Sequence, residues 1–400
     1  MAVDTEKLYQ ERLKRYYAAN HKEKPDRVPV RPFAAEIAGK IAGYNAQEVT
    51  HDVDKALEAV IRMCSTFDID ATVVNMVYVW TGMTESYGTK YFGVPGIDLE
   101  VNETFQYREP PEEEAFMRPE EYDRFIEDPN EFVLNVWAPR MSKYFVQPGE
   151  PNTWKNNLAW LKGGISMMYY FQKLGAQVQR MKEECGVVSC LSGALKAPFD
   201  ILADKFRGFR GVSYDIRRVP DKVLKATEAV APHMKWNALA GADPAKKVPI
   251  SHWMHRGATG FFSEEIFKKF YWPTLREVTE EIFREGHQII YYAEGKWAKN
   301  LKYFLELPEK SIIFHCDKDD IFEVHKVLGR KFAISGGIRN DLLAYGSPDE
   351  VRKHVKQVID GVAREGGYIL DAQAIMQQDT KIENFKAMID ATHEYGVYKS

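Results

Sequence analysis

The chain lacks the long apolar run that a membrane-spanning helix needs. No stretch of its 400 residues approaches the ~18–20 consecutive apolar residues that cross a bilayer. The N-terminus, MAVDTEKLYQERLKRYY, is charged and amphipathic, and it has no apolar core of the kind found in secretory signals. These absences predict a soluble, cytoplasmic protein without a membrane partner.

A block of basic residues is also missing. The formal net charge is -4, and no cluster of Lys and Arg of the nucleic-acid-binding type occurs. Proteins that bind nucleic acids usually concentrate positive charge in one patch. The sequence therefore disfavours a nucleic-acid partner.

Cysteine is scarce, and its spacing is not that of a metal site. The four cysteines are Cys64, Cys185, Cys190 and Cys316. None belongs to a CxxC or CxxxC pair, and the Cys185–Cys190 spacing fits no common zinc knuckle. We expect reduced, mostly buried thiols.

What the chain does contain is a long alternation of β-rich and helical segments after residue 152. Strands are predicted at 186–192, 248–253, 288–293, 311–316, 331–335 and 368–371, and helices at 156–185, 197–207, 220–236, 263–285, 296–305, 321–328, 348–364 and 381–395. Alternation of this kind is typical of parallel sheets. Because no GxGxxG loop follows the first strand, we predict an α/β fold of the closed (β/α)8 TIM-barrel type rather than a doubly wound sheet.

The segments before residue 152 extend this barrel. Residues 1–24 are predicted as a solvated helix, residues 52–67 as an amphipathic helix and residues 71–79 as a buried strand. Residues 97–150 are rich in Asp, Glu and Pro, which favours an acidic insertion or lid rather than core. The prediction is one barrel domain over 1–400 with an N-terminal helical extension and this insertion.

Polar side chains follow five consecutive predicted strands. The strand ends carry His252, Trp253 and His255; then Tyr291, Tyr292 and Glu294; then His315 and Asp317; then Arg339 and Asn340; then Asp371 and Gln373. Active sites of (β/α)8 barrels lie at the carboxyl ends of the strands. One histidine at such a position is more often structural than catalytic, but five polar strand ends in succession predict a pocket.

Several segments resemble the uroporphyrinogen decarboxylase superfamily. The best match is ISGGIRNDLLAYGSPDEVRKHVKQVIDGVAREGGYILDAQ, followed by DTKIENFKAMIDATHEYG. PDRVPVRPF near the N-terminus and SEEIFKKFYWPTLREVTEEIFREG are similar as well. The resemblance covers most of residues 25–397 and implies a (β/α)8 barrel and a homodimer. It is less specific about activity, because the superfamily includes both decarboxylases and corrinoid-linked methyltransferases.

The chain departs from the decarboxylase branch at its substrate-binding loop. Members of that branch carry an arginine-rich motif, RQAGR, that binds porphyrin carboxylates. Here Arg31 is the one arginine at the corresponding place. A porphyrin with many carboxylates needs many cations, so the resemblance disfavours a tetrapyrrole substrate.

The chain also departs from the methyltransferase branch at its zinc site. That branch typically binds zinc through HxC and a late Cys, and zinc there activates a thiol or alcohol. Tyr292-Ala293-Glu294 and about Ala374 stand at those positions. Zinc is therefore not expected, and no metal ligands are assigned. A non-standard metal site formed by Glu294 with His315, Cys316 or Asp317 is left open.

The remaining residues suit proton-assisted chemistry. A carboxylate beside the aromatic residues of YYAEGKW is expected to be desolvated, which raises its pKa and suits a general acid. We therefore assign proton donation to Glu294, with Tyr292 or His315 as substitutes and Asp317 orienting His315 or accepting a ring hydroxyl. Substrate binding is assigned to Tyr291, Trp297, His252, His255, Arg339, Asn340, Asp371 and Gln373.

The resemblance and these residues together predict a corrinoid-dependent methyltransferase of the O-demethylase kind. It would move a methyl group from a small methylated substrate to a separate corrinoid protein, and the aromatic residues favour a methoxylated aromatic donor. The cobalamin is expected on that partner because neither His252 nor His255 belongs to a DxHxxG motif. The 97–150 insertion is a candidate for docking the partner.

Two other functions stay open. One is a zinc-free decarboxylase, with Asp317 or Glu294 as proton donor and Arg339 as carboxylate clamp. The other is a non-catalytic binding barrel, which the acidic and histidine groups at several strand ends disfavour. The sequence leaves open the ring substituents of the donor and the choice between a corrinoid and a folate acceptor.

Overall fold

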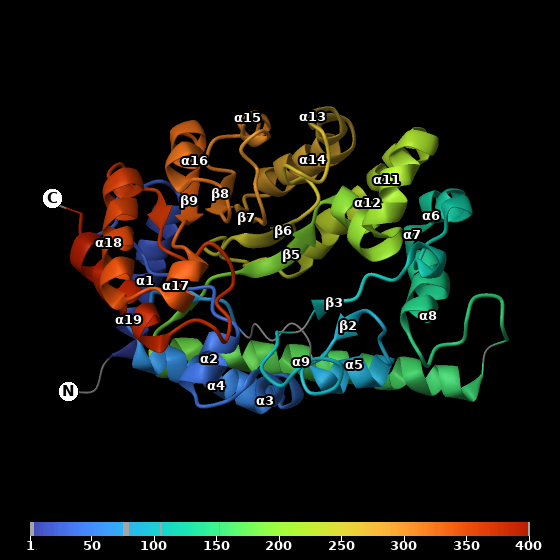
Figure 1. Ribbon diagram of the computed structural model, residues 1–400, viewed down its shortest axis with the longest axis horizontal. Helices are drawn as coiled ribbons and strands as arrows, with labels where there is room; N and C mark the ends of the chain where they lie inside the picture. The colour runs from blue at the N-terminus through green and yellow to red at the C-terminus, as the bar shows by residue number, and fades with distance from the viewer. Residues whose placement is uncertain (1–3, 75–79, 105, 152, 399–400) are drawn as a thin grey trace.

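The parallel strands close into the predicted (β/α)8 barrel (Figure 1). The computed structural model describes residues 4–74, 80–104, 106–151 and 153–398. The larger sheet has the order β10–β9–β8–β7–β6–β5. Its strands are β5 (Ser192–Lys196), β6 (Ile250–Met254), β7 (Ile289–Ala293), β8 (Ile312–Cys316), β9 (Ala333–Gly336) and β10 (Tyr368–Ile369).

The N-terminal segments complete the ring. β1 (Ala71–Thr72) pairs in parallel with β4 (Val188–Ser189), which leads into β5. Residues 28–34 fill the gap between β1 and β10. The backbone N–H of Arg31 donates to the Leu370 carbonyl at 3.0 Å, and the N–H of Asp70 donates to the Val30 carbonyl at 2.9 Å. The barrel is thereby closed by the first and last segments of the fold.

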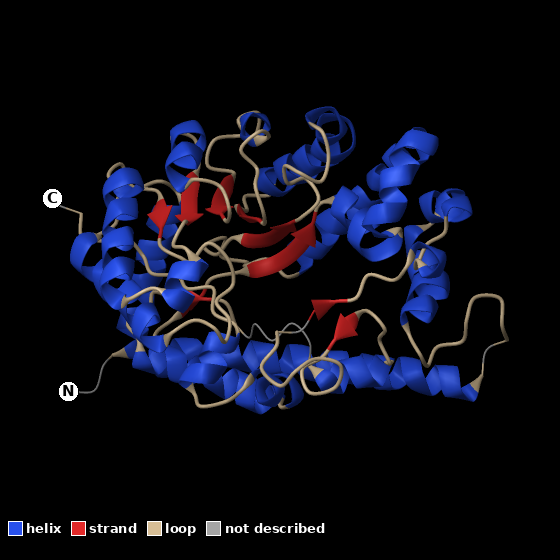
Figure 2. Cartoon of the chain, viewed as in Figure 1, coloured by secondary structure: helices blue, strands red, loops and turns tan. Residues whose placement is uncertain are grey.

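Helices surround the sheet, as Figure 2 shows. The α-helices are α1 (Thr5–Asn20), α2 (Glu36–Ile41), α3 (Ala46–His51), α4 (Val53–Thr66), α5 (Thr81–Tyr87), α6 (Tyr122–Glu127), α7 (Pro129–Phe132), α8 (Ala138–Met141), α9 (Trp154–Cys185), α10 (Pro198–Ile201), α11 (Gly208–Arg218), α12 (Pro220–Ala240), α13 (Glu264–Ile266), α14 (Trp272–Arg284), α15 (Leu301–Phe304), α16 (Ile321–Leu328), α17 (Asn340–Tyr345), α18 (Pro348–Val358) and α19 (Ile382–Tyr395). Short 3-10 turns are η1 (Glu112–Glu114) and η2 (Pro119–Glu121), and π-helical turns are η3 (Val133–Trp137), η4 (Leu202–Phe206), η5 (Phe267–Tyr271) and η6 (Ile359–Ala363). Within the described residues, none of the helices is both long and apolar enough to cross a membrane.

Most predicted elements are confirmed, and the exceptions have local causes. The helix predicted at 296–305 shortens to α15 because the Asp319 carboxylate accepts hydrogen bonds from the backbone N–H groups of Trp297 and Ala298, which holds them in a loop. The strand predicted at 71–79 is β1 alone among the described residues, and residues 75–79 lie outside them.

Two predictions about the N-terminal half are wrong. The helix α1 is not simply solvated, because Tyr16 is buried and its hydroxyl donates to the Cys190 carbonyl at 3.1 Å. In the 97–150 segment, β3 (Gln106–Tyr107) pairs antiparallel with the preceding β2 (Phe92–Gly93). The segment also contributes Tyr122, Phe125 and Phe132 to the main core. The segment was predicted as surface because its acidic residues alternate in sequence with the aromatic residues that the fold buries.

All four cysteines are buried and unpaired. Burial raises the pKa of every one of these thiols, and it raises that of Cys190 to about 12. Since the thiolate is the reactive form, none of the four is a nucleophile at neutral pH.

Candidate active site

A fully buried arginine joins several strands at the floor of the barrel. Arg31 forms an ion pair with Asp371 at 2.9 Å. It also donates hydrogen bonds to the Tyr292 hydroxyl, to Nδ1 of His315 at 3.2 Å and to the Ser335 hydroxyl at 3.2 Å. These partners come from β7, β8, β9 and the segment after β10. A buried charge needs such pairing, and the arrangement fixes the positions of Tyr292 and His315.

The floor determines the protonation state of His315. Because Arg31 is always a donor, Nδ1 of His315 is an acceptor, and the Nε2–H therefore donates to the Gln373 carbonyl at 3.0 Å. Burial and the charge of Arg31 lower the pKa of His315 well below its usual value. Burial likewise raises the pKa of Tyr292 well above its usual value. Neither group is a ready proton donor near neutral pH, which weakens the catalytic role predicted for both.

A pocket of about 640 Å³ lies above this floor at the carboxyl ends of the strands. One wall is aromatic: Trp253 stacks on Tyr292 with ring centroids 4.4 Å apart and planes 7° apart. Phe33 packs against both rings at 5.2 and 4.9 Å. Further lining residues are Tyr107, Phe261, Ile375, Asn340, Gln373, Asp317, Glu294, His255 and Arg256. The wall offers a flat apolar face and the rest of the lining offers polar groups, as small-molecule sites usually do.

A network of charged side chains lies along the rim of the pocket. Nδ1 of His255 lies 2.6 Å from Asp204, and its Nε2 lies 3.2 Å from Glu294. Asp204 also binds Lys196 at 3.0 Å and Arg256 at 2.7 Å. Burial alone lowers the pKa of His255, but the hydrogen bonds to Asp204 and Glu294 outweigh burial and raise the pKa to about 9. The imidazole is therefore a cation that holds Glu294 at the pocket.

The environment of Glu294 differs from the one expected. Its side chain is 48% exposed and ion-paired with His255, so the predicted desolvation of this carboxylate is wrong. The cause is the strand end itself, since Glu294 follows β7 and projects toward solvent at the rim.

Asp317 is the carboxyl that fits the description of a proton donor. It lines the pocket and is buried, and it accepts a hydrogen bond from the Gly295 N–H at 2.7 Å. Burial raises the pKa of Asp317 from 3.8 to about 6, against the opposing effect of the Gly295 hydrogen bond. Among the described residues, its carboxyl makes no other hydrogen bond. A carboxyl with a pKa near 6 exchanges protons readily at physiological pH.

The structure brings together seven of the residues assigned from sequence. Those that line the pocket are Tyr292, Glu294, His315, Asp317, His255, Asn340 and Gln373. Asp371 lies beneath the pocket as the partner of Arg31. Its carboxyl is fully buried, so the substrate contact predicted for it is wrong, and its role is to hold the floor.

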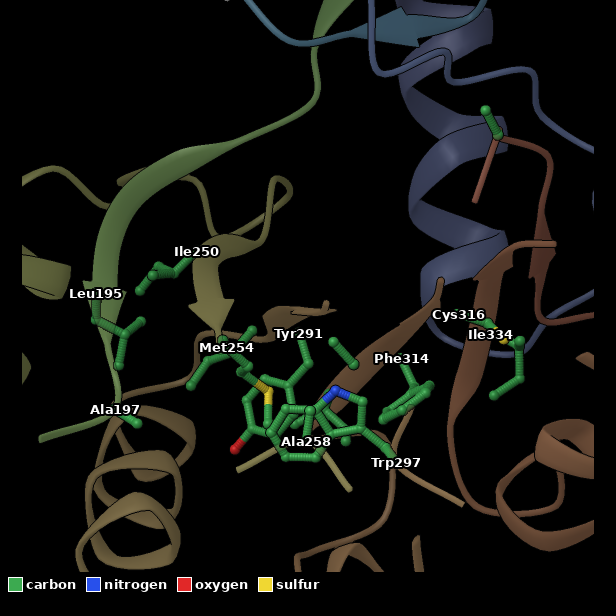
Figure 3. Packing of buried hydrophobic residues seen from close by; sticks show 14 of the residues in the cluster. Leu195, Ala197, Ile250, Met254, Ala258, Tyr291, Trp297, Phe314, Cys316 and Ile334 are labelled. Atoms are coloured by element: carbon green, nitrogen blue, oxygen red, sulfur yellow. The ribbon is translucent and has the colours of Figure 1, made fainter. Parts of the chain in front are cut away.

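The substrate-binding assignments of Tyr291 and His252 are wrong because neighbouring residues on a strand point to opposite faces, and that of Trp297 is wrong because its side chain is buried. Tyr292 and Trp253 point into the barrel, so Tyr291 and His252 point outward to the helices. The Tyr291 hydroxyl hydrogen-bonds to Thr279 of α14. Trp297 is buried in the same outer layer, where Figure 3 shows it among apolar side chains with Tyr291 and Phe314.

The substrate contact predicted for Arg339 is wrong for a different reason. Its side chain is exposed and forms an ion pair with Asp341 outside the pocket. The imidazole of His252 is buried, and neither of its ring nitrogens has a hydrogen-bond partner in the described structure. Burial lowers the pKa of His252 to about 3.

Sequence reasoning missed residues that come from distant parts of the chain. Arg31 and Phe33 belong to the first barrel segment, and Tyr107 comes from the β2–β3 pair. No spacing along the chain signals these contacts. Asp204 is different, because Asp200 and Asp204 lie four residues apart on the helix predicted at 197–207 and could have been recognised as a pair on one face.

The donor atoms for a family-type zinc site are not present. Tyr292 is engaged with Arg31, and Ala374 offers no ligand at the position of the late cysteine. Over the residues that the structure describes, no group of three or more His, Cys, Asp or Glu side chains is arranged to hold a metal ion. We therefore derive no zinc-dependent step.

Comparison with known proteins agrees with this fold. The family model for uroporphyrinogen decarboxylase (URO-D) matches residues 166–395. The chain belongs to the uroporphyrinogen decarboxylase family. Among solved structures, a methyltransferase from Methanosarcina mazei is similar over 96% of this chain and 98% of its own, with a TM-score of 0.63 and 14% sequence identity. This likeness shows the shared barrel. No curated protein sequence matches the chain significantly.

Proposed function

We propose that the protein is a methyltransferase that removes a methyl group from a methoxylated aromatic compound and passes it to a separate corrinoid protein. The observation that carries the proposal is the combination of a stacked aromatic wall with a protonatable carboxyl, Asp317, in one pocket. The similar methyltransferase structure from Methanosarcina mazei supports the reaction class.

The pocket provides what an aromatic ether requires. The flat face of Trp253 and Tyr292 offers a stacking surface for the ring of the donor. When the methyl group leaves, negative charge develops on the ring oxygen, and a proton or hydrogen-bond donor lowers the barrier. Asp317 is the proposed donor. Glu294, ion-paired with His255, is proposed to accept a hydrogen bond from a neighbouring ring hydroxyl.

The methyl acceptor is proposed to be a corrinoid on a partner protein. When the partner is bound, the cobalamin supplies the nucleophile for the methyl group. The half-exposed Glu294 and the exposed Phe261 indicate that the pocket opens to solvent, as access for a partner's cofactor requires. Tyr107 brings the 97–150 segment to the same opening, so this segment remains the proposed docking element.

The decarboxylase alternative finds less support. Arg31 is fully buried and paired with Asp371 in the floor, and the side chain of Arg339 lies away from the pocket. Neither arginine is available to bind a substrate carboxylate, so a decarboxylase function is not favoured.

The test uses the full chain, a reduced corrinoid protein and a panel of methoxybenzoates. We expect methylation of the corrinoid, read from its visible spectrum, and formation of the matching phenol in equal amount. Hydroxybenzoates without the methoxy group serve as controls and should give no spectral change. Failure of every methylated compound with every corrinoid protein tried would refute the proposal.

A further inference from the structure

Arg256, at the rim of the pocket, has hydrogen-bond donors that the protein leaves unused. The residue follows the end of β6 by two positions and lines the pocket. Its Nε donates to Asp204 at 2.7 Å. A guanidinium group has four further N–H groups on its terminal nitrogens, and over the part of the chain that the structure describes these make no hydrogen bond. The terminal edge of the group therefore offers paired donors to a ligand.

The guanidinium is held in one position before any ligand binds. Its Cζ lies over the rings of Phe209 and Phe261, 5.0 and 5.1 Å from their centroids, and these two rings pack edge to face. The backbone of Arg256 is fixed as well, because its N–H donates to the buried carboxyl of Asp200 at 2.8 Å. Since little conformational freedom remains to be lost, a contact with this side chain contributes more to binding than one with a mobile surface arginine.

One acidic residue competes for the terminal edge, but its contact is long. Nη2 of Arg256 lies 3.7 Å from Oε2 of Glu109, which is an ion pair without a hydrogen bond. Glu109 is 40% exposed, and its other oxygen accepts the backbone N–H of Phe209 at 2.5 Å. Exposed ion pairs are weak. A ligand carboxylate in direct contact with the terminal N–H groups is therefore the better partner.

The planar edge of the guanidinium matches a carboxylate in shape and charge. The two groups form a pair of parallel, charge-assisted hydrogen bonds in one plane. The same pocket carries the stacked wall of Trp253 and Tyr292. Trp253 and Arg256 are three residues apart, which is at most about 11 Å of chain, so one small molecule can contact both. A ring on the wall with a carboxylate at Arg256 would use both features.

We propose that Arg256 binds a carboxylate on the ring of the donor, so that the substrates of this pocket are methoxylated aromatic acids. The identity of the donor rests on the proposed function, whereas the contact between Arg256 and the acid does not. The carboxylate serves binding and is not the reacting group. Arg256 stabilises the charge on the carboxylate, and loss of carbon dioxide would move that charge onto the ring, so the contact opposes decarboxylation.

Other ring substituents match the guanidinium less well. A neutral aromatic ether gives Arg256 no charged acceptor and forgoes the stronger class of hydrogen bond. A ring amine would place a second cation beside the guanidinium, and like charges in contact are unfavourable. The unused donors of Arg256 therefore favour an anionic substituent.

Isothermal titration calorimetry of the full chain, without any corrinoid, tests the contact. The probes are 2-, 3- and 4-methoxybenzoate, each compared with the methoxybenzamide of the same substitution, which has a similar shape and no charge. For the isomer that binds most tightly, we expect a dissociation constant at least about tenfold lower than that of its amide, as is usual for hydrogen bonds between charged groups.

Three variants assign this preference to Arg256. Arg256→Met keeps an apolar stem against the two phenylalanine rings and should remove the difference between acid and amide. Arg339→Met is the matched control, because Arg339 is paired with Asp341 outside the pocket, and it should leave the difference unchanged. Glu109→Gln removes the competing charge while its amide oxygen can still accept from Phe209, so it should bind the acid about two- to fivefold more tightly.

The outcomes that overturn the proposal include some that need no variant. Equal affinity of the wild type for acid and amide, or no binding of any methoxybenzoate at about 10 mM, would each overturn it. An undiminished preference for the acid in Arg256→Met would do so as well, and so would release of carbon dioxide from a bound methoxybenzoate. An acid that binds through Arg256 but gives no methyl group to any corrinoid protein would instead refute the proposed function and leave the contact in place.

Discussion

Replacing Asp317 by Asn should make the protein more stable and much less active. The side chain keeps its size, and its oxygen can still accept the Gly295 N–H, so the fold is preserved. What disappears is the ability to give a proton. Loss of a general acid typically costs 10²–10⁴-fold in rate, and we expect a loss of about this size in methyl transfer.

The stability change follows from the pKa of Asp317. Folding raises this pKa from 3.8 to about 6, so the folded protein binds the proton more tightly than the unfolded chain. The wild type therefore loses stability as pH rises from 3.8 through 6, and Asp317→Asn does not. About two units correspond to about 3 kcal/mol at most, and contact with the open pocket reduces this to on the order of 1–2 kcal/mol.

Two assays check the argument. Single-turnover methyl transfer should give a wild-type rate that falls as pH rises through about 6, since the protonated acid is required, and a low, flat profile for Asp317→Asn. Thermal denaturation should show the variant more stable at pH 8 and equal to the wild type near pH 3.5. Glu294→Gln is the control, with less than about tenfold loss and an unchanged pH profile. A rate for Asp317→Asn within threefold of the wild type would refute the assignment.

Three further predictions concern the floor, the wall and the outer layer. Arg31→Met leaves the carboxylate of Asp371 buried without its partner and should lower the free energy of unfolding by about 3–5 kcal/mol in urea titrations. Trp253→Leu should raise KM for an aromatic donor about tenfold through loss of the stacked wall, while Trp236→Leu should leave KM unchanged in the same assay. His252→Phe removes two unpaired buried nitrogens and should raise stability by about 1 kcal/mol at pH 7. Because the pKa of His252 falls to about 3 on folding, the wild type loses stability as pH falls below 6.5, so the gap between the two in thermal denaturation should widen toward pH 4.

Most strands after residue 152 and their order along the chain were predictable because their sequences are locally unambiguous, whereas β5 (Ser192–Lys196) was not predicted. β7 and β8 are uninterrupted β-rich runs, and their predicted limits differ from the structure by one residue at the start. The helix α16 begins and ends where predicted, and Asp320 caps it by accepting from the backbone N–H of Phe322. Residues close together in the sequence determine where such elements begin and end, so one sequence is enough to predict them.

The direction of the side chains was not predictable from the same information. A strand exposes alternate residues to opposite faces, and the sequence alone did not decide whether Tyr291 or Tyr292 points inward. The pair Arg31 and Tyr292 is separated by 261 positions, and nothing in the sequence joins them. The pKa of a carboxyl group depends on its burial in the closed barrel, which the sequence does not show. Proton donation was therefore assigned to Glu294 rather than to Asp317.

The Arg31 cluster also bears on how this pocket can change in evolution. One guanidinium holds together the first segment of the barrel, three strands and the segment after β10, so the pocket floor and the closure of the fold depend on the same atoms. A mutation there alters stability before it can alter specificity. The rim residues Phe261, Glu294 and Ile375 line the pocket and do not belong to the Arg31 cluster that closes the barrel. New donor specificities should therefore arise by substitutions at the rim, and libraries built to change the substrate should keep the floor constant.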